Sequence, residues 1–267
     1  MKRFKPYLST LRLRAMLELQ YRGAAVGGML TQLFFGFILV FLYHALYASG
    51  GQQSSSLSQI VSYVWLQQAF FRVIIGSDGA LNSEVMSGDV VYSLCRPVDL
   101  YGYWYMRAVA YRAVGSLMRA ALMLPVALLL PQPLGLALPG SAAGLAAFIL
   151  SLAMGVLVMA ALENIMSACT LITLDHRGAA NVLGMFNAFA AGNLLPLTLF
   201  PDSWQRFILS TPFAQTLDVP IRYYTGQLPF GSLGGTLALQ LFWLAALALA
   251  GWLLWRRALN RMVIQGG

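Results

Sequence analysis

About six long apolar runs occupy almost the whole chain, and each approaches the length that a helix needs to cross a bilayer. Such a helix takes roughly 20 predominantly apolar residues. Only 10% of the residues are charged, whereas soluble domains carry about a quarter. The charges are mostly confined to alternate connections between the runs. We therefore exclude a soluble protein and predict an all-α, polytopic integral membrane protein.

The expected transmembrane helices are separated by short connections. They cover residues 24–47, 57–75, 109–130, 141–171, 178–199 and 233–255. No remaining stretch is long enough for a separate soluble domain, so residues 1–267 are expected to form a single transmembrane domain. The net charge of +8 is concentrated before the first run and after the last. Because Lys and Arg are retained on the cytoplasmic side, both termini are predicted to be cytoplasmic, and the basic character requires no nucleic-acid partner.

The N-terminal segment, residues 1–22, is expected to lie on the cytoplasmic membrane surface. It places Leu8 and Leu19 against Arg14 and Glu18 at helical spacing. An arginine-rich pattern of this kind is typical of an amphipathic helix in contact with lipid. A solvated tail that only fixes the topology is the alternative.

The segment 200–230 is too polar to span the membrane and too apolar to be a free loop. Acids and bases balance one another here, between prolines and aromatic residues: Asp202, Arg206, Asp218, Arg222, Trp204 and Tyr223. Such aromatic residues favour the headgroup level. We predict an external helical hairpin between the fifth and sixth spans that re-enters the membrane from outside.

No motif for an energy source or for catalysis is present in the sequence. A P-loop needs glycines and a lysine in the order G-x-x-x-x-G-K-[ST], and the only lysines are Lys2 and Lys5, neither preceded by glycine. Cys95 and Cys169 indicate neither a disulfide framework nor a metal site. We therefore expect no catalytic residue, no metal and no cofactor bound by this chain.

The most polar internal segment, residues 76–99, follows the second run. Its pattern predicts a short helix that begins after Ser83, breaks near Gly88 and stops before Pro97. Apolar residues such as Val90 are expected to rest on the membrane. The length and mixed surface favour a helix that docks onto another protein, and an ordinary polar loop is the alternative.

Two groups of residues resemble a known family. One is the run from Glu84 through Gly88 to Leu94-Cys95-Arg96-Pro97, and the other comprises Pro196, Phe200, Pro201, Trp204, Pro212, Arg222 and Gly226. Together with the number of spans, they resemble the permease subunits of type-two ABC exporters, in the bacterial drug- or viologen-exporter-like branch. Cys95 stands where leucine is common in that branch. The resemblance covers essentially the whole chain.

This resemblance implies a division of labour in the bacterial inner (plasma) membrane. Two permease subunits, identical or related, form the path, and separate ATPase subunits below them bind ATP and Mg. The internal helix between spans two and three then transmits the movement of the ATPase, and the implied coupling residues are Glu84, Gly88, Asp89, Tyr92, Arg96 and Pro97. The complex is expected to move a hydrophobic, amphipathic or cationic substrate outward by alternating access.

Polar residues within the expected spans are candidates for a substrate pathway or for helix pairing. Arg119 and Glu163 lie at similar depths by helical rise, so that antiparallel neighbours can pair them. Asn164 and Asn187 are candidates for the same pathway or for interhelical hydrogen bonds. A stripe of small residues favours close helix packing, and it consists of Gly184, Ala188 and Gly192.

Two other classes of function are compatible with a membrane protein of this size. A stand-alone transporter or channel driven by an ion gradient generally needs charged residues along a path, and only Arg119 and Glu163 lie well inside the expected spans. An intramembrane enzyme acting on lipid needs a reactive constellation that the sequence does not offer. A P-loop ATPase encoded by a neighbouring gene distinguishes the exporter from both.

Overall fold

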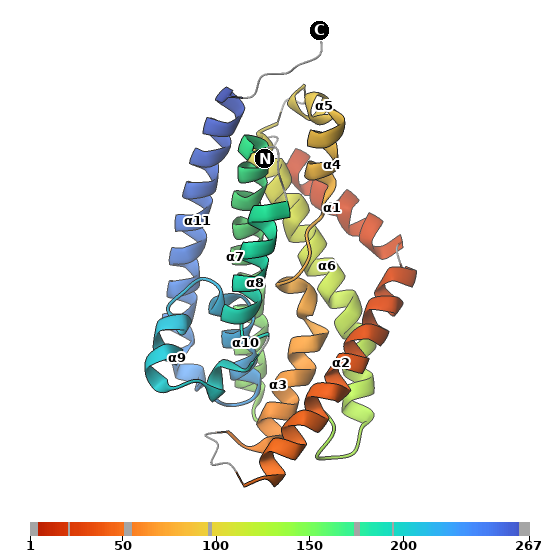
Figure 1. Cartoon of the computed structure of the whole chain (residues 1–267), viewed down its shortest axis with the longest axis vertical. Coiled ribbons are helices and arrows are strands. Elements are labelled where there is room, and N and C mark those ends of the chain that lie inside the picture. The colour runs from red at the N-terminus through yellow and green to blue at the C-terminus, as the bar shows by residue number, and fades with distance from the viewer. Residues whose placement is uncertain are drawn as a thin grey trace.

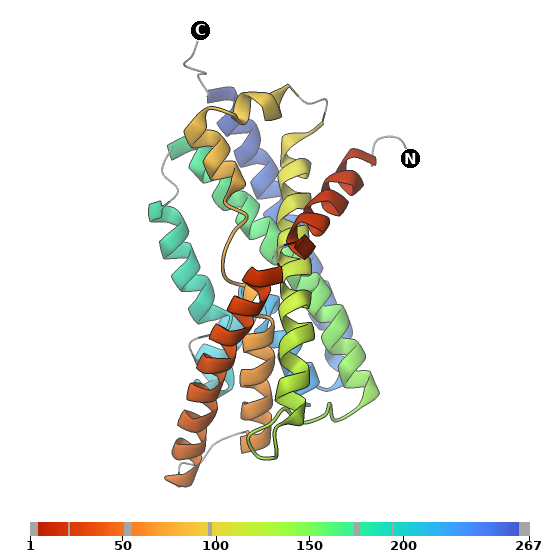
Figure 2. The same ribbon diagram turned by 90° about the vertical axis from the view of Figure 1, so that its right-hand side faces the viewer.

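The computed structural model describes residues 5–20, 22–50, 55–95, 98–173, 177–193 and 195–261. Every regular element in these ranges is a helix (Figures 1 and 2), so the predicted all-α fold is confirmed. The α-helices are α1 (Lys5–Gln20), α2 (Arg22–Ala48), α3 (Leu57–Ala69), α4 (Ala80–Ser87), α5 (Val90–Leu94), α6 (Leu100–Leu129), α7 (Ala142–Thr173), α8 (Arg177–Ala190), α9 (Asp202–Leu209), α10 (Asp218–Tyr224) and α11 (Leu233–Arg261). The 3-10 helices are η2 (Phe71–Val73), η3 (Leu197–Leu199), η4 (Ala214–Thr216) and η5 (Phe230–Ser232).

Four helices in the described ranges are long and apolar enough to cross a bilayer, as expected of a polytopic membrane protein. These segments are Ala25–Ala48 of α2, Leu100–Leu129 of α6, Ala142–Ile172 of α7 and Phe230–Asn260, which contains α11. Two further expected spans correspond to α3 and α8, which have only 13 and 14 residues, or about 20 Å by helical rise. Since the hydrocarbon core is roughly 30 Å thick, the number of six crossings stays a prediction.

The start of α6 differs clearly from its expected boundary. The apolar run predicts a span over 109–130, but the helix already begins at Leu100. The Asp99 side chain accepts a hydrogen bond from the Gly102 N–H at 2.8 Å. Such an N-cap satisfies a backbone donor in the first turn, so the helix extends past the apolar run and toward α4 and α5.

α3 lies at the centre of the main hydrophobic core. Its residues from Ile60 to Ala69 are all buried, including the polar ones. Trp65 packs edge-to-face on Phe37 of α2, with 5.2 Å between the ring centroids, and its indole N–H donates to the Leu134 carbonyl oxygen at 2.8 Å. Contacts with α2, α6 and α10 enclose the helix. A short helix with several polar residues is therefore held inside the bundle.

A second apolar cluster gathers the ends of α6, α7 and α11 under α4 and α5. Leu81 of α4 and Val90 of α5 pack with Trp104, Leu171 and Trp255. In Figure 1, α4 and α5 lie at the same end of the molecule as the last turns of α11. The expectation that Val90 rests on the membrane is therefore wrong, because this side chain is buried against other helices of the protein.

α1 packs along α6, and the polar and apolar sides of this helix point in directions other than the expected ones. Arg14 and Glu18, predicted on a solvated face, turn inward and form ion pairs. Leu8 and Leu19 remain 63% and 49% exposed. Arg14 and Glu18 thus face the bundle, whereas Lys5 and Arg12 stay exposed together with an apolar row. Contact of that row with lipid stays a prediction.

The segment 200–230 is helical but is built into the bundle. All residues of α10 are buried, and this helix packs against α7 and α3. A Cβ at Gly155 of α7 would collide with the Thr216 carbonyl oxygen in η4, so glycine allows the close approach. In Figure 1, α9 and α10 lie beside one half of α7. Re-entry of this hairpin into the membrane stays a prediction.

Candidate functional site

The segment between η2 and α4, residues 74–79, is fixed to two long helices, and we call it the strap. Arg112 of α6 is only 2% exposed. Its guanidinium donates to the carbonyl oxygens of Val73 at 2.6 Å and Gly76 at 3.0 Å. Gly76 has a φ of +85°, a left-handed conformation that favours glycine. The start of the strap is therefore bent around one buried cation.

Glu163 of α7 completes the attachment of the strap. One of its carboxylate oxygens accepts a hydrogen bond from Arg112 Nε at 2.8 Å, and the other accepts one from the Asp78 backbone N–H at 3.2 Å. Both charged side chains are buried. A buried pair of this kind is costly to break because the remaining charge is left uncompensated. This buried ion pair thus contacts α6, α7 and the strap.

Further ion pairs connect the strap to α1. Asp78 pairs with Arg107 of α6 at 2.9 Å and with Arg14 of α1 at 2.6 Å. Glu18 of α1 pairs with Arg14 at 2.9 Å and with Arg72 at 2.7 Å. We define the inner charge network as Arg14, Glu18, Arg72, Asp78, Arg107, Arg112 and Glu163. Networks of several charges are worth more than isolated surface pairs, and this one joins α1, η2, the strap, α6 and α7.

Glu84 extends the inner charge network to α4 and α5. One carboxylate oxygen accepts a hydrogen bond from the Ser93 hydroxyl of α5 at 2.7 Å, and the other lies 4.0 Å from Arg107. Gly88, between the two helices, has a φ of +81°. The predicted helix break at Gly88 is therefore confirmed, although α4 begins earlier than expected, at Ala80. Glu84 holds the two short helices against each other and against α6.

The other predicted coupling residues lie on or near α5. Tyr92 is 73% exposed, and the Asp89 carboxylate accepts a hydrogen bond from the Ser87 hydroxyl at 2.7 Å. Arg96 and Pro97 lie outside the described residues. α5 therefore offers an exposed aromatic side chain at the end of the molecule, while Glu84 anchors the helix from beneath.

The predicted pairing of Arg119 with Glu163 is wrong. Glu163 pairs with Arg112 instead. Arg119 lies against α2, where a Cβ at Gly28 would be 2.8 Å from its Nε. Within the described ranges Arg119 forms no ion pair. Arg112 and Arg119 of α6 thus have different surroundings, and the buried one is Arg112.

Asn164 and Asn187 connect separate parts of the chain by hydrogen bonds to the backbone. Asn164 Nδ2 donates to the Tyr101 carbonyl oxygen at 3.1 Å. Asn187 Nδ2 of α8 donates to the Ile74 carbonyl oxygen of the strap at 2.8 Å. The bond of Asn164 thus joins α7 to α6, whereas the bond of Asn187 joins α8 to the strap. A role in a substrate pathway stays a prediction.

The predicted stripe of small residues does not form one helix face. Ala188 is buried, whereas a Cβ at Gly184 would meet no atom within 4 Å. Gly192 lies beyond the end of α8 with a φ of +75°, and its position is set by the close approach of the Tyr63 hydroxyl. Because the helix ends at Ala190, the spacing of four residues does not extend to Gly192.

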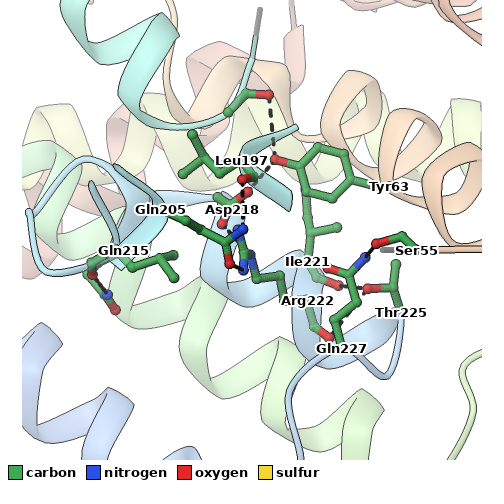
Figure 3. Close-up of polar contacts among 12 residues, drawn as sticks. Ser55, Tyr63, Leu197, Gln205, Gln215, Asp218, Ile221, Arg222, Thr225 and Gln227 are labelled. Atoms are coloured by element: carbon green, nitrogen blue, oxygen red, sulfur yellow. Dashed lines mark hydrogen bonds and ion pairs between the residues drawn. The ribbon is translucent and has the colours of Figure 1, made fainter. Parts of the chain in front are cut away.

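A second polar cluster is buried in the hairpin, as Figure 3 shows. Asp218 is fully buried. Its carboxylate accepts hydrogen bonds from the Tyr63 hydroxyl and from Arg222 Nε, each at 2.6 Å. Arg222 Nη1 also donates to Gln205 Oε1 of α9 at 3.1 Å. We call Tyr63, Gln205, Asp218 and Arg222 the hairpin polar cluster. It joins α9 and α10 to the central helix α3.

The edge of the hairpin is held by neutral hydrogen bonds. Gln240 of α11 donates to the carbonyl oxygens of Ser151 at 3.0 Å and of Gln215 at 2.9 Å. The Tyr224 hydroxyl donates to the Ala137 carbonyl oxygen at 3.0 Å. Burial raises the pKa of Tyr224 above its ordinary value, because the ionised phenolate is poorly solvated there. This shift favours the protonated hydroxyl that donates to Ala137.

A comparison of the sequence with models of known protein families identifies the family of this chain. The family described as ABC-2 family transporter protein matches residues 28–266. The chain belongs to the ABC-2 transporter family. A search of curated proteins found no match. An ABC-2 membrane protein is the permease component of an ABC transporter and is not itself the ATPase. The long apolar helices of this ABC-2 protein agree with a multi-pass membrane location.

Several polar residues of the ABC-2 permease were not predicted as site residues. Arg112 lies close to the start of the expected span 109–130, and Tyr63 and Gln240 are isolated polar residues within apolar runs. One available signal was the spacing of Asp218 and Arg222 by four residues, which brings opposite charges together on a helix. Within the described part of the chain, no group of three His, Cys, Asp or Glu residues is arranged to hold a metal.

Proposed function

We propose that this ABC-2 permease forms the membrane path of an ATP-driven exporter of the drug- or viologen-exporter-like branch. A second permease subunit, identical or related, completes the path, and separate ATPase subunits supply ATP hydrolysis with Mg. The proposal includes six crossings of a bacterial plasma membrane, both termini in the cytoplasm, and outward movement of a hydrophobic or amphipathic substrate. The resemblance of the 76–99 segment and the hairpin to that branch supports the direction of transport.

One observation carries the proposal, namely the continuous polar connection from α5 to the long helices. It passes from Ser93 to Glu84, from there to Arg107 and Asp78, and through the strap to Glu163. Each step is a hydrogen bond or an ion pair between different elements. A push on α5 therefore acts directly on the strap and on the ion pair that joins α6 to α7.

We infer that the ATPase binds α4 and α5 and moves the strap relative to α6 and α7. Two ATPase states that bind this surface with different affinities shift the permease between two conformations, since a ligand shifts an equilibrium only by its differential affinity. Buried ion pairs suit such a connection because they have discrete arrangements rather than a continuous range. The exposed Tyr92 side chain is the proposed contact with the ATPase, and Glu84 transmits the movement.

The experiment is co-purification of the tagged permease with the P-loop ATPase encoded by a neighbouring gene. Tyr92→Ala changes only an exposed side chain of α5 and is expected to weaken ATPase binding. Glu84→Arg reverses the charge beside Arg107 and is expected to abolish it. The matched control is Phe230→Ala, another exposed aromatic residue, located in η5, which should bind the ATPase like the unaltered protein.

The result that overturns this proposal is transport by the purified permease alone, driven by a proton gradient. In that case the chain is a stand-alone transporter, and the α4–α5 surface has another role. Equal ATPase recovery with Tyr92→Ala, Glu84→Arg and Phe230→Ala would also contradict it, because the ATPase would then bind elsewhere.

A further inference from the structure

A cavity of about 490 Å³ lies between the strap, α6, α7 and α8. Its volume falls within the range of roughly 300–1,000 Å³ that is usual for small-molecule sites. Most of its wall is apolar, with side chains such as Trp104, Met159, Met166, Met185 and Phe213. Methionine adapts its shape to different ligands because it is unbranched and polarizable. The cavity therefore has the size and surface of a site for an apolar molecule.

Within the described residues, three buried side-chain atoms of this wall have neither a hydrogen-bond partner nor an ion-pair partner, namely Asn164 Oδ1 and one atom each of Asn187 and Trp104. Asn187 and Trp104 both line the cavity and are buried. Asn187 Oδ1 and Trp104 Nε1 have no hydrogen-bond partner in the described part of the chain. Buried polar atoms are nearly always hydrogen-bonded, so an unpaired acceptor and an unpaired donor in one cavity indicate a bound polar group.

The charged residues of the wall exclude an ionic group at this place. Arg107 pairs with Asp78 at 2.9 Å, and Arg112 pairs with Glu163 at 2.8 Å. The four charges therefore balance, and each already has its counterion. An ionic ligand would have to break a buried pair, which is costly. A neutral group that donates and accepts hydrogen bonds meets no such competition.

We propose that this cavity binds one uncharged amphipathic molecule, with an apolar body against the methionines and a hydroxyl or amide group at Asn187 and Trp104. Because residues 74–79 form one wall, occupancy and the position of the strap are linked, and the coupling is reciprocal. The proposal that the cavity binds such a molecule does not require the ATPase assignment to hold. Its assignment as the transported substrate rests on the proposed function.

The test uses the full chain in phosphatidylcholine nanodiscs and a photoreactive octanol that carries an aliphatic diazirine. After illumination, mass spectrometry locates the labelled residues. Labelling is expected to be saturable, suppressed by excess 1-octanol, and centred on Met159, Met166 and Phe213. The corresponding diazirine of octane, which lacks the hydroxyl, is expected to label these residues more weakly.

Gly184→Phe is designed to fill the cavity, because Gly184 lines it and a Cβ at this position has no atom within 4 Å. It is expected to abolish the saturable labelling. Phe189→Leu is the matched control in α8, since Phe189 does not line the cavity, and it should label normally. Asn187→Leu removes the acceptor and is expected to weaken octanol binding about fivefold, the effect of a typical hydrogen bond, and octane binding much less.

The inference is overturned if labelling is non-saturable and spread over lipid-facing residues such as Phe34, or if Gly184→Phe leaves it unchanged. It is also overturned if Asn187→Leu affects both probes equally. Failure of the proposed function gives a different pattern, in which the octanol label is saturable but no ATPase co-purifies with the permease. Saturable labelling together with octanol-dependent ATP hydrolysis supports both.

Discussion

Arg112 Nε and Glu163 Oε2 are 2.8 Å apart in the interior of the protein, and this pair joins α6 to α7. The same two side chains also hold the strap, through the carbonyl oxygens of Val73 and Gly76 and the N–H of Asp78. Apart from their mutual contact, the hydrogen bonds of these two side chains thus go to η2 and to the strap, which leads to α4 and α5. The pair serves both the stability of the bundle and its connection to the proposed ATPase surface.

Removal of one member of this pair should destabilise the protein strongly. Glu163→Ala leaves the Arg112 charge buried without a counterion, which typically costs about 3–5 kcal/mol. The double variant Arg112→Met with Glu163→Met removes both charges and is expected to recover most of the loss. Thermal unfolding in detergent, followed by tryptophan fluorescence, measures the midpoints.

Arg119→Met is the matched control on the same helix, because Arg119 forms no ion pair within the described residues. A small change in its midpoint is expected. If Glu163→Ala unfolds at the same temperature as Arg119→Met, the buried pair does not hold the bundle.

The sequence misidentified this pair because the depth of a charge depends on where its helix begins. The apolar run placed the start of the span near residue 109, whereas α6 begins at Leu100 behind the Asp99 cap. Counted from the true helix ends, Arg112 and Glu163 both lie about 15–18 Å along their antiparallel helices. The Asp99 cap lies outside the apolar run. Hydropathy therefore does not show where α6 begins, and it does not show that Glu163 pairs with Arg112.

The hairpin polar cluster predicts two effects of different size. Asp218→Ala leaves Arg222 buried without its counterion and should cost about 3–5 kcal/mol. Tyr63→Phe removes one neutral hydroxyl from the same carboxylate, and a hydrogen bond to a charged group is worth about 1.5–3 kcal/mol. The midpoint of thermal unfolding should therefore fall more for Asp218→Ala. The opposite order would show that the tyrosine hydroxyl, and not Arg222, determines the stability of the hairpin.

Two helical glycines, one in α7 and one in α8, should respond in opposite directions to alanine. Gly155→Ala places a methyl group against the Thr216 carbonyl oxygen, so α7 and η4 must separate and stability should fall. Gly184→Ala meets open space and should raise stability by about 0.5–1 kcal/mol, the usual gain in a helix interior. Thermal midpoints of the two variants provide the comparison, and a stabilising Gly155→Ala would contradict the close packing of η4 on α7.

Local signals in the sequence predicted some features well and others poorly. The long run at 141–171 became α7 almost unchanged, and the glycine at position 88 breaks the helix as expected, because both depend only on neighbouring residues. The burial of α10 was not predicted, since Asp218 and Arg222 suggest an exposed segment until their mutual pairing and the hydroxyl of Tyr63 are known. Whether such a segment is buried depends on contact partners that are distant in the sequence.

The bend at Gly88 predicts a selective effect on coupling. Gly88→Ala forces a Cβ into a left-handed conformation at a cost of about 1 kcal/mol, although no neighbouring atom obstructs it. ATP hydrolysis by the permease–ATPase complex should decrease while the thermal midpoint changes little. Gly88→Asn should retain most of the activity, because asparagine tolerates this conformation. Equal rates for both variants and the unaltered protein would mean that the angle between α4 and α5 does not matter for coupling.

The proposed orientation is testable with the natural thiol at Cys95, which is exposed next to α5. In the Cys169→Ser variant, a membrane-impermeant maleimide is expected to label Cys95 in inverted vesicles and not in intact cells. The control is Ser49→Cys in a background without Cys95 and Cys169, since Ser49 is exposed just after the far end of α2. That thiol should react in intact cells. Labelling of Cys95 from outside would place α4 and α5 on the face opposite the ATP supply, and no cytoplasmic ATPase could then act on the strap.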